Sequence, residues 1–364
     1  MKKAIIAMSG GVDSSVAALL TLQKEYECIG ATMKLYETGD IVCSDKTCCA
    51  ADDVEDARQV AAKLGIPYYV FNFCADFQKE VIERFVCSYE TGATPNPCIE
   101  CNKHLKFERL FDKMYELGYD YVVTGHYARI EYDENTGRYL LKKAKDISKD
   151  QSYVLYSLSQ EQLAHILFPL GEIEEKSVTR SIAEENGFIN AKKSESQDIC
   201  FVPDGDYAAF IERYRGKAYP HGNFVDTEGN ILGEHKGIIR YTVGQRKGLG
   251  FGGGPWFVVK KNIKRNILFV SHGYDPEKVY KDHIRMNDFH FITENPWEGT
   301  LATDIPITFK IRHTPEYLKG TIRQEDDGSW FIQAEEKIHG VAPGQFCVVY
   351  DKHHHLCYGS GEIS

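Results

Sequence analysis

Short apolar runs alternate with longer stretches of helical periodicity in the first third of the chain, and this alternation constrains the fold more than any other feature. The apolar runs, which we interpret as strands, cover 4–8, 28–35, 68–73 and 121–124. Helical patterns separate them at 12–22, 52–64 and 104–117. Because strands joined through helices pair in parallel, the pattern predicts an α/β fold with a doubly wound parallel sheet.

The pattern changes twice further along the chain. Helical periodicity continues to about residue 205 and then gives way to glycines and short runs of alternating apolar residues. We expect an α/β domain at 1–205, a small β-rich domain at 206–279 and an antiparallel β-barrel at 280–364. A chain of 364 residues is long enough for several domains.

Composition narrows the class of protein. No run approaches the roughly 18 apolar residues that a membrane-spanning helix needs, so we expect no association with a membrane. The 11 cysteines are an odd number in a chain that opens without an export signal, which favours reduced thiols in the cytoplasm. The formal charge of -10 argues against a protein that coats nucleic acid over its whole surface.

The segment SGGVDSS, from Ser9 to Ser15, joins the first predicted strand to the first predicted helix. Backbone N–H groups and the helix dipole make such a junction an anion site. Gly10 and Gly11 allow the backbone to approach a phosphate closely, and the serines add hydroxyl donors. The loop lacks the lysine of a Walker-type loop and the spacing of a dinucleotide fingerprint, so it predicts a phosphate site of another kind. A tight turn with a serine cap would use the same residues.

This loop resembles the pyrophosphate loop of the N-type ATP pyrophosphatases, enzymes that split ATP into AMP and pyrophosphate to activate an oxygen. Five further motifs resemble those of the tRNA-specific 2-thiouridylases: TPNPCIECNKHLKF, VVTGHYAR, KDQSYVLY, SESQDICF and YTVGQRKGLG. They occur in the family's order over essentially the whole chain. The resemblance implies that 1–205 is the catalytic domain of a tRNA-uridine 2-sulfurtransferase, which replaces the C2 oxygen of the wobble uridine, U34, with sulfur.

The same resemblance implies that ATP is a substrate and that Mg²⁺ accompanies it, with Asp13 beside the phosphates. The residues implied to bind ATP are the loop with its flanks and two residues at strand ends: Ala7, Met8, Ser9, Gly10, Gly11, Val12, Asp13, Ser14, Ser15, Met33 and Gly125. Taken singly, Met33 would be an ordinary core methionine and Gly125 a turn glycine.

Thiolation needs a sulfur nucleophile beside the activated oxygen. A thiolate can carry sulfur as a persulfide and then form a disulfide with a second thiol. The resemblance implies Cys101 as the nucleophile and Cys200 as the persulfide carrier. Cys98 stands where the family often has an aspartate that works near the uracil. Together with Cys101 and Cys200 it can instead hold three irons of a 4Fe-4S cluster, and both routes of sulfur delivery stay open.

The stretch 231–272 carries eight Lys or Arg against one acidic residue, interleaved with glycines and with Tyr241, Phe251, Trp256 and Phe257. That combination suits a structured RNA, so tRNA is the expected partner. The resemblance implies tRNA contacts at Asp150, Gln151, Ser152, Arg312, His313 and Gln345. The uridine must leave its stack to react. The candidates that meet it are Asn96, Pro97 and Cys98, with His126 at the mouth of the site.

Some questions stay open at this point. The sulfur donor could be a cysteine desulfurase, a sulfur relay protein or free sulfide. An AMP-forming ligase or amidotransferase acting on a small metabolite would use the same loop, but it leaves the basic stretch and the cysteines unexplained. A non-enzymatic ATP-binding protein could respond to redox state through Cys101 and Cys200. Cys43, Cys48 and Cys49 form a further grouping, which we interpret as a loop.

Overall fold

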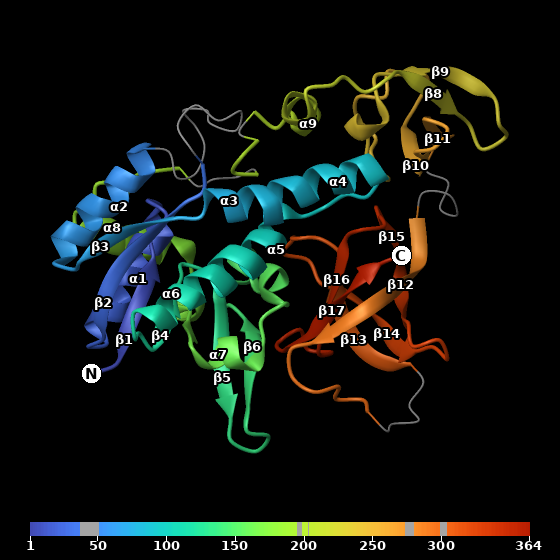
Figure 1. Ribbon diagram of the computed structural model, residues 1–364. Coiled ribbons are helices and arrows are strands. Elements are labelled where there is room, and N and C mark those ends of the chain that lie inside the picture. Colours follow the sequence, from blue (N-terminus) through green and yellow to red (C-terminus); the bar gives the residue numbers. More distant parts are fainter. Residues whose placement is uncertain (37–50, 195–198, 203, 274–279, 299–303) are drawn as a thin grey trace.

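The computed structural model describes residues 1–36, 51–194, 199–202, 204–273, 280–298 and 304–364. Along the chain it contains a helix-covered parallel sheet, a four-stranded sheet and a closed barrel (Figure 1). The grouping of Cys43, Cys48 and Cys49 lies outside the described residues. Within those residues, no helix combines the length and the apolar character needed to cross a bilayer.

The first sheet has the strand order β3-β2-β1-β4-β7, and its pairs are parallel. Its strands are β1 (Lys3–Ala7), β2 (Glu27–Lys34), β3 (Tyr68–Asn72), β4 (Tyr121–Val123) and β7 (Ile166–Leu167). β1 lies in the middle, where its apolar sequence KAIIA is buried on both faces. The chain winds outward from β1 to β3 and then returns to the other side of β1. The predicted doubly wound α/β fold is confirmed, and a crevice is expected where the winding reverses.

Helices cover both faces of this sheet. α1 (Val12–Gln23), α2 (Ala51–Leu64) and α8 (Lys176–Glu185) share one core with Ala4 and Ile6 of β1. η2 (Asn102–Arg109) and α6 (Leu110–Glu116) share another core with Ile5. Because successive side chains of a strand point to opposite faces, this alternation along β1 separates the two layers of helices.

Two helical rods lie between β3 and β4. The first consists of α3 (Cys74–Phe77), η1 (Gln78–Ile82) and α4 (Glu83–Thr91), and the second of α5 (Pro97–Cys101), η2 and α6. η1 and η2 are π-helical. The helix predicted at 104–117 therefore begins earlier, at Pro97. Asn96 caps it by accepting a hydrogen bond from the Cys98 N–H at 3.1 Å, so Cys98 lies in the first helical turn.

The remaining elements before the second sheet are short. They are the paired strands β5 (Ala128–Asp133) and β6 (Arg138–Lys143), and the helices η3 (Ile147–Lys149), η4 (Ser152–Leu155), α7 (Gln160–Ala164), η5 (Pro169–Glu172) and α9 (Tyr207–Arg215). The second sheet has the order β10-β11-β8-β9. It consists of β8 (Gly222–Val225), β9 (Ile231–His235), β10 (Trp256–Asn262) and β11 (Ile267–His272), with η6 (Ile238–Arg240) between β9 and β10.

The barrel closes in the order β12-β15-β14-β13-β16-β17, and its strands pair antiparallel, as predicted. The strands are β12 (Tyr280–Phe291), β13 (Ile305–Lys310), β14 (Leu318–Gln324), β15 (Trp330–His339), β16 (Phe346–Tyr350) and β17 (Cys357–Ile363). Residues such as Met286, Phe309 and Ile332 point inward and form its core. Alternation of inward and outward side chains explains why short apolar runs predicted these strands.

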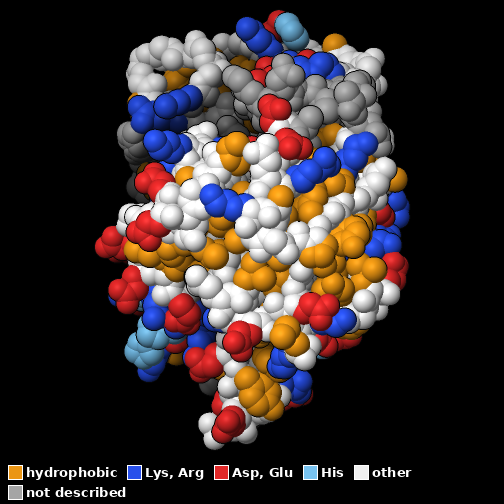
Figure 2. All heavy atoms as spheres, turned by 90° about the vertical axis from the view of Figure 1, so that its left-hand side faces the viewer, with side chains coloured by type: hydrophobic (Ala, Val, Ile, Leu, Met, Phe, Trp, Pro, Cys, Tyr) orange, Lys and Arg blue, Asp and Glu red, His pale blue; other side chains and the backbone are white. Residues whose placement is uncertain are grey.

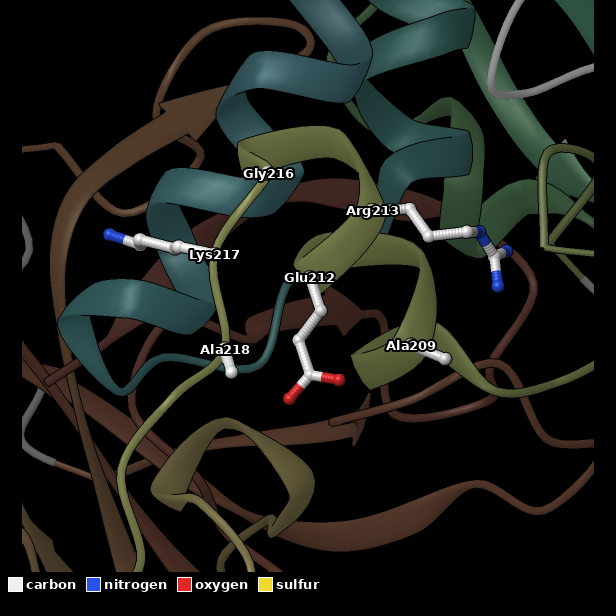
Figure 3. Close-up of a pocket in the computed structure, with 6 residues that line it drawn as sticks. All are labelled: Ala209, Glu212, Arg213, Gly216, Lys217 and Ala218. Carbon is white, nitrogen blue, oxygen red and sulfur yellow. The ribbon is translucent and has the colours of Figure 1, made fainter.

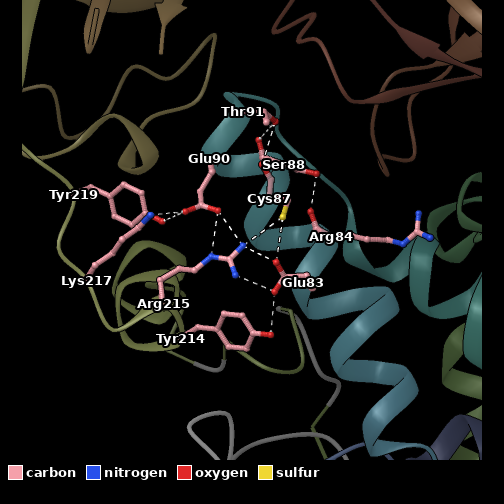
Figure 4. Close-up of polar contacts among 10 residues, drawn as sticks. All are labelled: Glu83, Arg84, Cys87, Ser88, Glu90, Thr91, Tyr214, Arg215, Lys217 and Tyr219. Carbon is pink, nitrogen blue, oxygen red and sulfur yellow. Dashed lines mark hydrogen bonds and ion pairs between the residues drawn. The ribbon is translucent and has the colours of Figure 1, made fainter. Parts of the chain in front are cut away.

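Two polar joints tie the parts of the molecule together. Arg215 of α9 bridges Glu83 and Glu90 of α4, at 2.7 Å and 3.0 Å (Figure 4). Lys310 of β13 lies 3.4 Å from Asp150, between η3 and η4, and both side chains are fully buried. The first joint connects the helical rod to the segment before the second sheet, and the second connects the parallel-sheet part to the barrel.

Candidate active site

The loop between β1 and α1 has the shape of an anion site. Gly10 has a φ of +75°, and a Cβ atom there would lie 2.3 Å from the backbone oxygen of Asp53, so glycine is required. Gly11 precedes α1 and supplies no side-chain cap, which leaves the N–H groups of the first turn to a ligand. Ser14 Oγ donates to the Gly11 carbonyl at 2.9 Å, and the Ser9 N–H donates to Ser14 Oγ at 3.2 Å. These bonds shape the loop before any ligand binds.

A cavity of about 430 Å³ adjoins this loop. Nine of the residues implied to bind ATP line it: Ala7, Met8, Ser9, Gly11, Val12, Asp13, Ser14, Met33 and Gly125. Gly10 and Ser15 are not in its wall. Gly10 instead forms the turn, and the buried Ser15 accepts a hydrogen bond from Asn190 at 2.9 Å. The volume lies in the usual range for small-molecule sites.

The three cysteines singled out for sulfur chemistry line the same cavity. Cys98 and Cys101 come from α5, and Cys200 comes from a segment that precedes α9. Cys98 is exposed, whereas Cys101 and Cys200 are half-buried and pack against the same apolar core. Residues far apart in the sequence therefore meet beside the phosphate loop.

The donors in the cavity can be compared with those that metals require. Three irons of a cluster need three thiolates around one centre. The described residues contain no group of three His, Cys, Asp or Glu side chains placed to hold a single metal ion. In a 4Fe-4S cluster each thiolate binds a different iron, and Cys98, Cys101 and Cys200, which line this cavity, are the residues that would hold it. Mg²⁺ needs only one or two carboxylates beside phosphate oxygens. The Asp13 carboxylate in the wall of the cavity fits that need.

Basic side chains that the sequence analysis missed also line the cavity: Lys106, Lys176, Arg180 and Lys193. Lys176 Nζ pairs with Asp13 Oδ1, which also accepts a hydrogen bond from the Tyr127 hydroxyl at 3.0 Å. Lys193 Nζ lies 2.5 Å from a carboxylate oxygen of Asp53 and 3.4 Å from the Gly10 carbonyl. These contacts place two ammonium groups beside the phosphate loop. In the sequence, only the four-residue spacing of Lys176 and Arg180 indicates that these two side chains share one face of α8.

His126 also lines the cavity and is only 7% exposed. Burial, aided by the charge of Lys106, lowers the pKa of His126 well below its ordinary value. Lys106 Nζ, which can only donate, lies 3.5 Å from His126 Nε2. The Nε2 atom therefore accepts, and Nδ1–H donates to Thr124 Oγ1 at 2.7 Å. This histidine is neutral and held in one tautomer.

The other residues implied to meet tRNA divide into two groups. Pro97, Cys98, His126 and Gln151 line the cavity. Asn96, Asp150, Ser152, Arg312, His313 and Gln345 do not. Asp150 and Ser152 are buried, because Asp150 accepts hydrogen bonds from Ser152 Oγ at 2.8 Å and from Tyr317 at 2.9 Å within the joint to the barrel. His313 lies 3.1 Å from the Asp150 carbonyl and Arg312 is exposed.

The basic stretch is only partly available to a ligand. Six of its cations are exposed: Lys236, Arg246, Lys247, Lys260, Lys264 and Arg265. Arg240 pairs with Glu212 at 2.7 Å, and Lys261 donates to the Tyr241 carbonyl at 2.8 Å. Burial lowers the pKa of Lys261 to about 8. Tyr241 and Phe257 are buried in the core, so their rings are not available to stack on bases.

Two other surface features do not form comparable sites. Hydrophobic side chains gather across the middle of the face at the left of Figure 1, among charges of both signs (Figure 2). A hollow of about 390 Å³ lies beside α9 (Figure 3). Arg213 and Lys217 point in opposite directions there, so its charged side chains do not converge on one ligand.

Three sequence families match consecutive parts of the chain. The tRNA methyl transferase HUP domain matches residues 2–204, the tRNA methyl transferase PRC-barrel domain 208–272 and the aminomethyltransferase beta-barrel domain 281–363. The first of these matches more than half of the chain.

Relatives match nearly the whole length. The tRNA-specific 2-thiouridylase MnmA of Clostridioides difficile is 47% identical over 96% of this chain and 95% of its own. The protein of the same name from Acetivibrio thermocellus is 46% identical over 96% of both chains. Among solved structures, a 4-thiouridine synthetase in complex with RNA and ATP overlaps 56% of this chain and 45% of its own, with 20% identity and a TM-score of 0.36.

Proposed function

The chain belongs to the family of tRNA-specific 2-thiouridylases, and from that membership we propose that it uses ATP to replace the C2 oxygen of the tRNA wobble uridine with sulfur. One observation carries the proposal: the phosphate loop, Cys101 and Cys200 share one cavity. ATP activates the oxygen bonded to C2, and sulfur then attacks C2 itself. The phosphate loop and the two cysteines must therefore both lie within reach of the uracil ring.

The first step activates the uridine. Its C2 oxygen attacks the α-phosphorus of ATP, the bond from that phosphorus to the bridging oxygen breaks, and pyrophosphate leaves. The first-turn N–H groups of α1 bind the departing pyrophosphate together with Lys176 and Lys193, and the adenine lies against Met33. Mg²⁺, held by Asp13 and phosphate oxygens, neutralises phosphate charge when it is bound.

The second step transfers sulfur. Cys200 receives a persulfide from a donor that carries one, the terminal sulfur attacks C2, and AMP leaves. The Cys101 thiolate then attacks Cys200 Sγ, and the S–S bond breaks with its electron pair going to the sulfur on C2. The products are 2-thiouridine and a Cys101–Cys200 disulfide, which a dithiol reductant returns to thiols. We propose this route because it needs only the two thiols that line the cavity with the phosphate loop, Cys101 and Cys200.

tRNA docking uses groups outside the nucleotide pocket. The exposed cations at Lys260, Lys264 and Arg265 bind backbone phosphates, and Gln151 and His126 meet the flipped base at the wall of the cavity. Lys106 supplies positive charge at this end of the cavity, where the neutral His126 supplies none. Asp150 and Ser152 act by holding the barrel in place rather than by touching RNA.

The test combines protein, ATP, Mg²⁺, a persulfide donor and unmodified tRNA, and it measures pyrophosphate and 2-thiouridine together. We expect equal amounts of both products. Cys101→Ala and Cys200→Ala should abolish 2-thiouridine while ATP still binds. Cys87→Ala, which changes an exposed thiol outside the cavity wall, is the matched control. Thiolation retained in either cavity variant, or pyrophosphate release on a small metabolite without tRNA, would contradict the proposal.

A spectrum separates the two sulfur routes. Protein isolated without oxygen should be colourless and fully active with a persulfide donor. Visible iron–sulfur absorption that disappears in Cys98→Ala together with activity would overturn the persulfide route.

A further inference from the structure

The sulfur of Cys200 is in direct contact with a tyrosine that no sequence motif singled out. Tyr36 OH lies 3.1 Å from Cys200 Sγ, within hydrogen-bond range for sulfur. Tyr36 follows β2 closely, and 164 residues separate the two partners in the sequence. The residue between β2 and Tyr36, Leu35, lines the cavity. The contact therefore lies beside the cavity that Cys200 shares with the phosphate loop.

The phenol ring is held firmly. Tyr36 is 5% exposed, and its ring packs edge-on against Phe77 with centroids 5.2 Å apart. Phe77 packs in the same way against Phe201, at 5.8 Å. Because Phe201 directly follows Cys200, the hydroxyl and the sulfur are both fixed to one buried aromatic side chain. The geometry of the contact is thus set by packing and does not depend on a ligand.

We propose that Tyr36 is a positioning residue for Cys200. The Tyr36 hydroxyl donates a hydrogen bond to the Cys200 thiolate and directs that sulfur into the cavity. Hydrogen bonds to an ionised acceptor are roughly twice as strong as neutral ones, so the bond favours the thiolate over the thiol. When the persulfide forms, the thiolate sulfur of Cys200 attacks the terminal sulfur of the donor, so the bond acts before that step by raising the fraction of Cys200 that is ionised. The assigned purpose rests on the proposed function, whereas the contact itself does not.

Other charged side chains line the same cavity as Cys200. They are Lys106, Lys176, Arg180 and Lys193, with Asp13 and Asp53. Replacing Tyr36 by phenylalanine leaves all of them in place and removes only one oxygen atom. Tyr89 offers a matched control, because it is also 5% exposed and belongs to the same apolar core, where its ring packs against Phe85 and Tyr207.

The experiment measures alkylation of Cys200 in the full-length protein. Wild type, Tyr36→Phe and Tyr89→Phe are exposed briefly to iodoacetamide between pH 5.5 and 9.5. Mass spectrometry then quantifies the peptide that contains Cys200, with the exposed Cys87 as an internal reference. We expect the pH midpoint for Cys200 to rise by about one unit in Tyr36→Phe, with a loss of rate of roughly tenfold at pH 7. Tyr89→Phe and the Cys87 peptide should be unchanged.

A second variant guards against misfolding. Replacing Tyr36 with 3-fluorotyrosine keeps the ring and the hydroxyl but makes the hydroxyl a stronger donor, so the midpoint for Cys200 should move down. A midpoint that stays fixed in both variants, or that shifts equally in Tyr89→Phe, would overturn the assignment. The labelling uses neither ATP nor tRNA, so its failure leaves the proposed thiolation intact, and a failure of thiolation leaves the labelling result intact.

Discussion

The Asp13 carboxylate shows how a single residue can serve two states of the site. Its Oδ1 atom pairs with Lys176 and accepts a hydrogen bond from Tyr127, and the Lys176 ammonium lies 4.9 Å from the centre of the Tyr127 ring. The three groups satisfy one another without nucleotide. A triphosphate brings stronger anionic partners for the ammonium. We therefore expect Lys176 to turn from Asp13 to the phosphates and to free the carboxylate for Mg²⁺.

Replacing Lys176 tests that exchange. Lys176→Met should weaken ATP binding by about tenfold, because one of the cations that face the phosphates is lost. Equilibrium dialysis with and without Mg²⁺ measures the affinity. Lys192→Met is the control, since Lys192 is exposed next to the cavity residue Lys193. Equal affinity in Lys176→Met and wild type would show that the ammonium stays with Asp13.

Local sequence predicted the residues whose role depends on their immediate neighbours. Gly10 could be recognised because a tight strand-to-helix turn needs glycine, and Cys101 because it lies in a family motif. Lys176 and Tyr36 could not, because each acquires its role from a partner more than 160 residues away. Ser152 was expected at the RNA surface, yet packing of the barrel buries it completely.

At the scale of elements, the π-helix η2 sets the relation between Cys101 and Lys106. In an α-helix, residues five positions apart point about 140° away from each other. The i→i+5 hydrogen bonds of a π-helix widen the turn and bring such residues toward the same side. η2 begins directly after Cys101, and both side chains line the cavity. The amino-acid pattern of this segment predicts a helix but does not distinguish the π form, because side-chain periodicity over so few residues fits both.

The charge that η2 brings to the cavity can be removed. Lys106→Met should lower the rate of thiolation by roughly a hundredfold at saturating ATP. The negative charge that develops on the reacting groups beside His126 would lose the positive charge of Lys106. The substitution should also raise the pKa of His126 toward its ordinary value, although burial, the larger cause, remains. Single-turnover kinetics measure the rate, and histidine NMR measures the pKa.

A neighbouring lysine provides the comparison for this variant. Lys103 is exposed on the same element, so Lys103→Met should change neither quantity. A wild-type rate in Lys106→Met would show that Lys106 takes no part in thiolation and that the π-helical form of η2 is not needed to place it.

At the scale of the whole molecule, strand and helix alternation predicted the parallel sheet, and short alternating runs predicted the barrel. The joints between these parts were not predictable. Asp150 lies in a motif that resembles an RNA contact, but its side chain is fully buried against Lys310. Burial lowers the pKa of Lys310 while the charge of Asp150 opposes that shift. A long-range ion pair of this kind has no periodic or local signature in a sequence.

Removing one charge of the buried pair should destabilise the protein more than removing both. Asp150→Ala leaves the Lys310 ammonium uncompensated in the interior and should cost about 3 to 5 kcal/mol of unfolding free energy. The double variant Asp150→Asn with Lys310→Met removes both charges and should cost less than the single one. Urea unfolding followed by fluorescence measures each value. A double variant at least as unstable as Asp150→Ala would mean that the ion pair itself stabilises the joint to the barrel.

The first joint, between Arg215 of α9 and Glu83 and Glu90 of α4, gives the molecule a defined sensitivity to acid. Burial opposes ionisation of Glu90, but hydrogen bonds from Tyr219, Lys217 and Arg215 outweigh it and lower its pKa from 4.5 to about 2. Arg215 likewise lowers the pKa of Glu83. Since both carboxylates have lower pKa values in the folded state, their stabilisation is complete above pH 4.5 and is lost as the pH falls toward 2.

Arg215→Met should therefore reduce the unfolding free energy by about 2 kcal/mol at pH 6, and its deficit relative to wild type should shrink steadily below pH 4.5. Urea unfolding is the suitable measurement, because a neutral denaturant does not screen the ion pairs as guanidinium does. Arg213→Met, on the exposed side of the same helix, should match wild type at every pH. A deficit that stayed constant between pH 6 and pH 3 would show that Arg215 acts by packing. Convergence of the two proteins in acid would assign the joint to its charges.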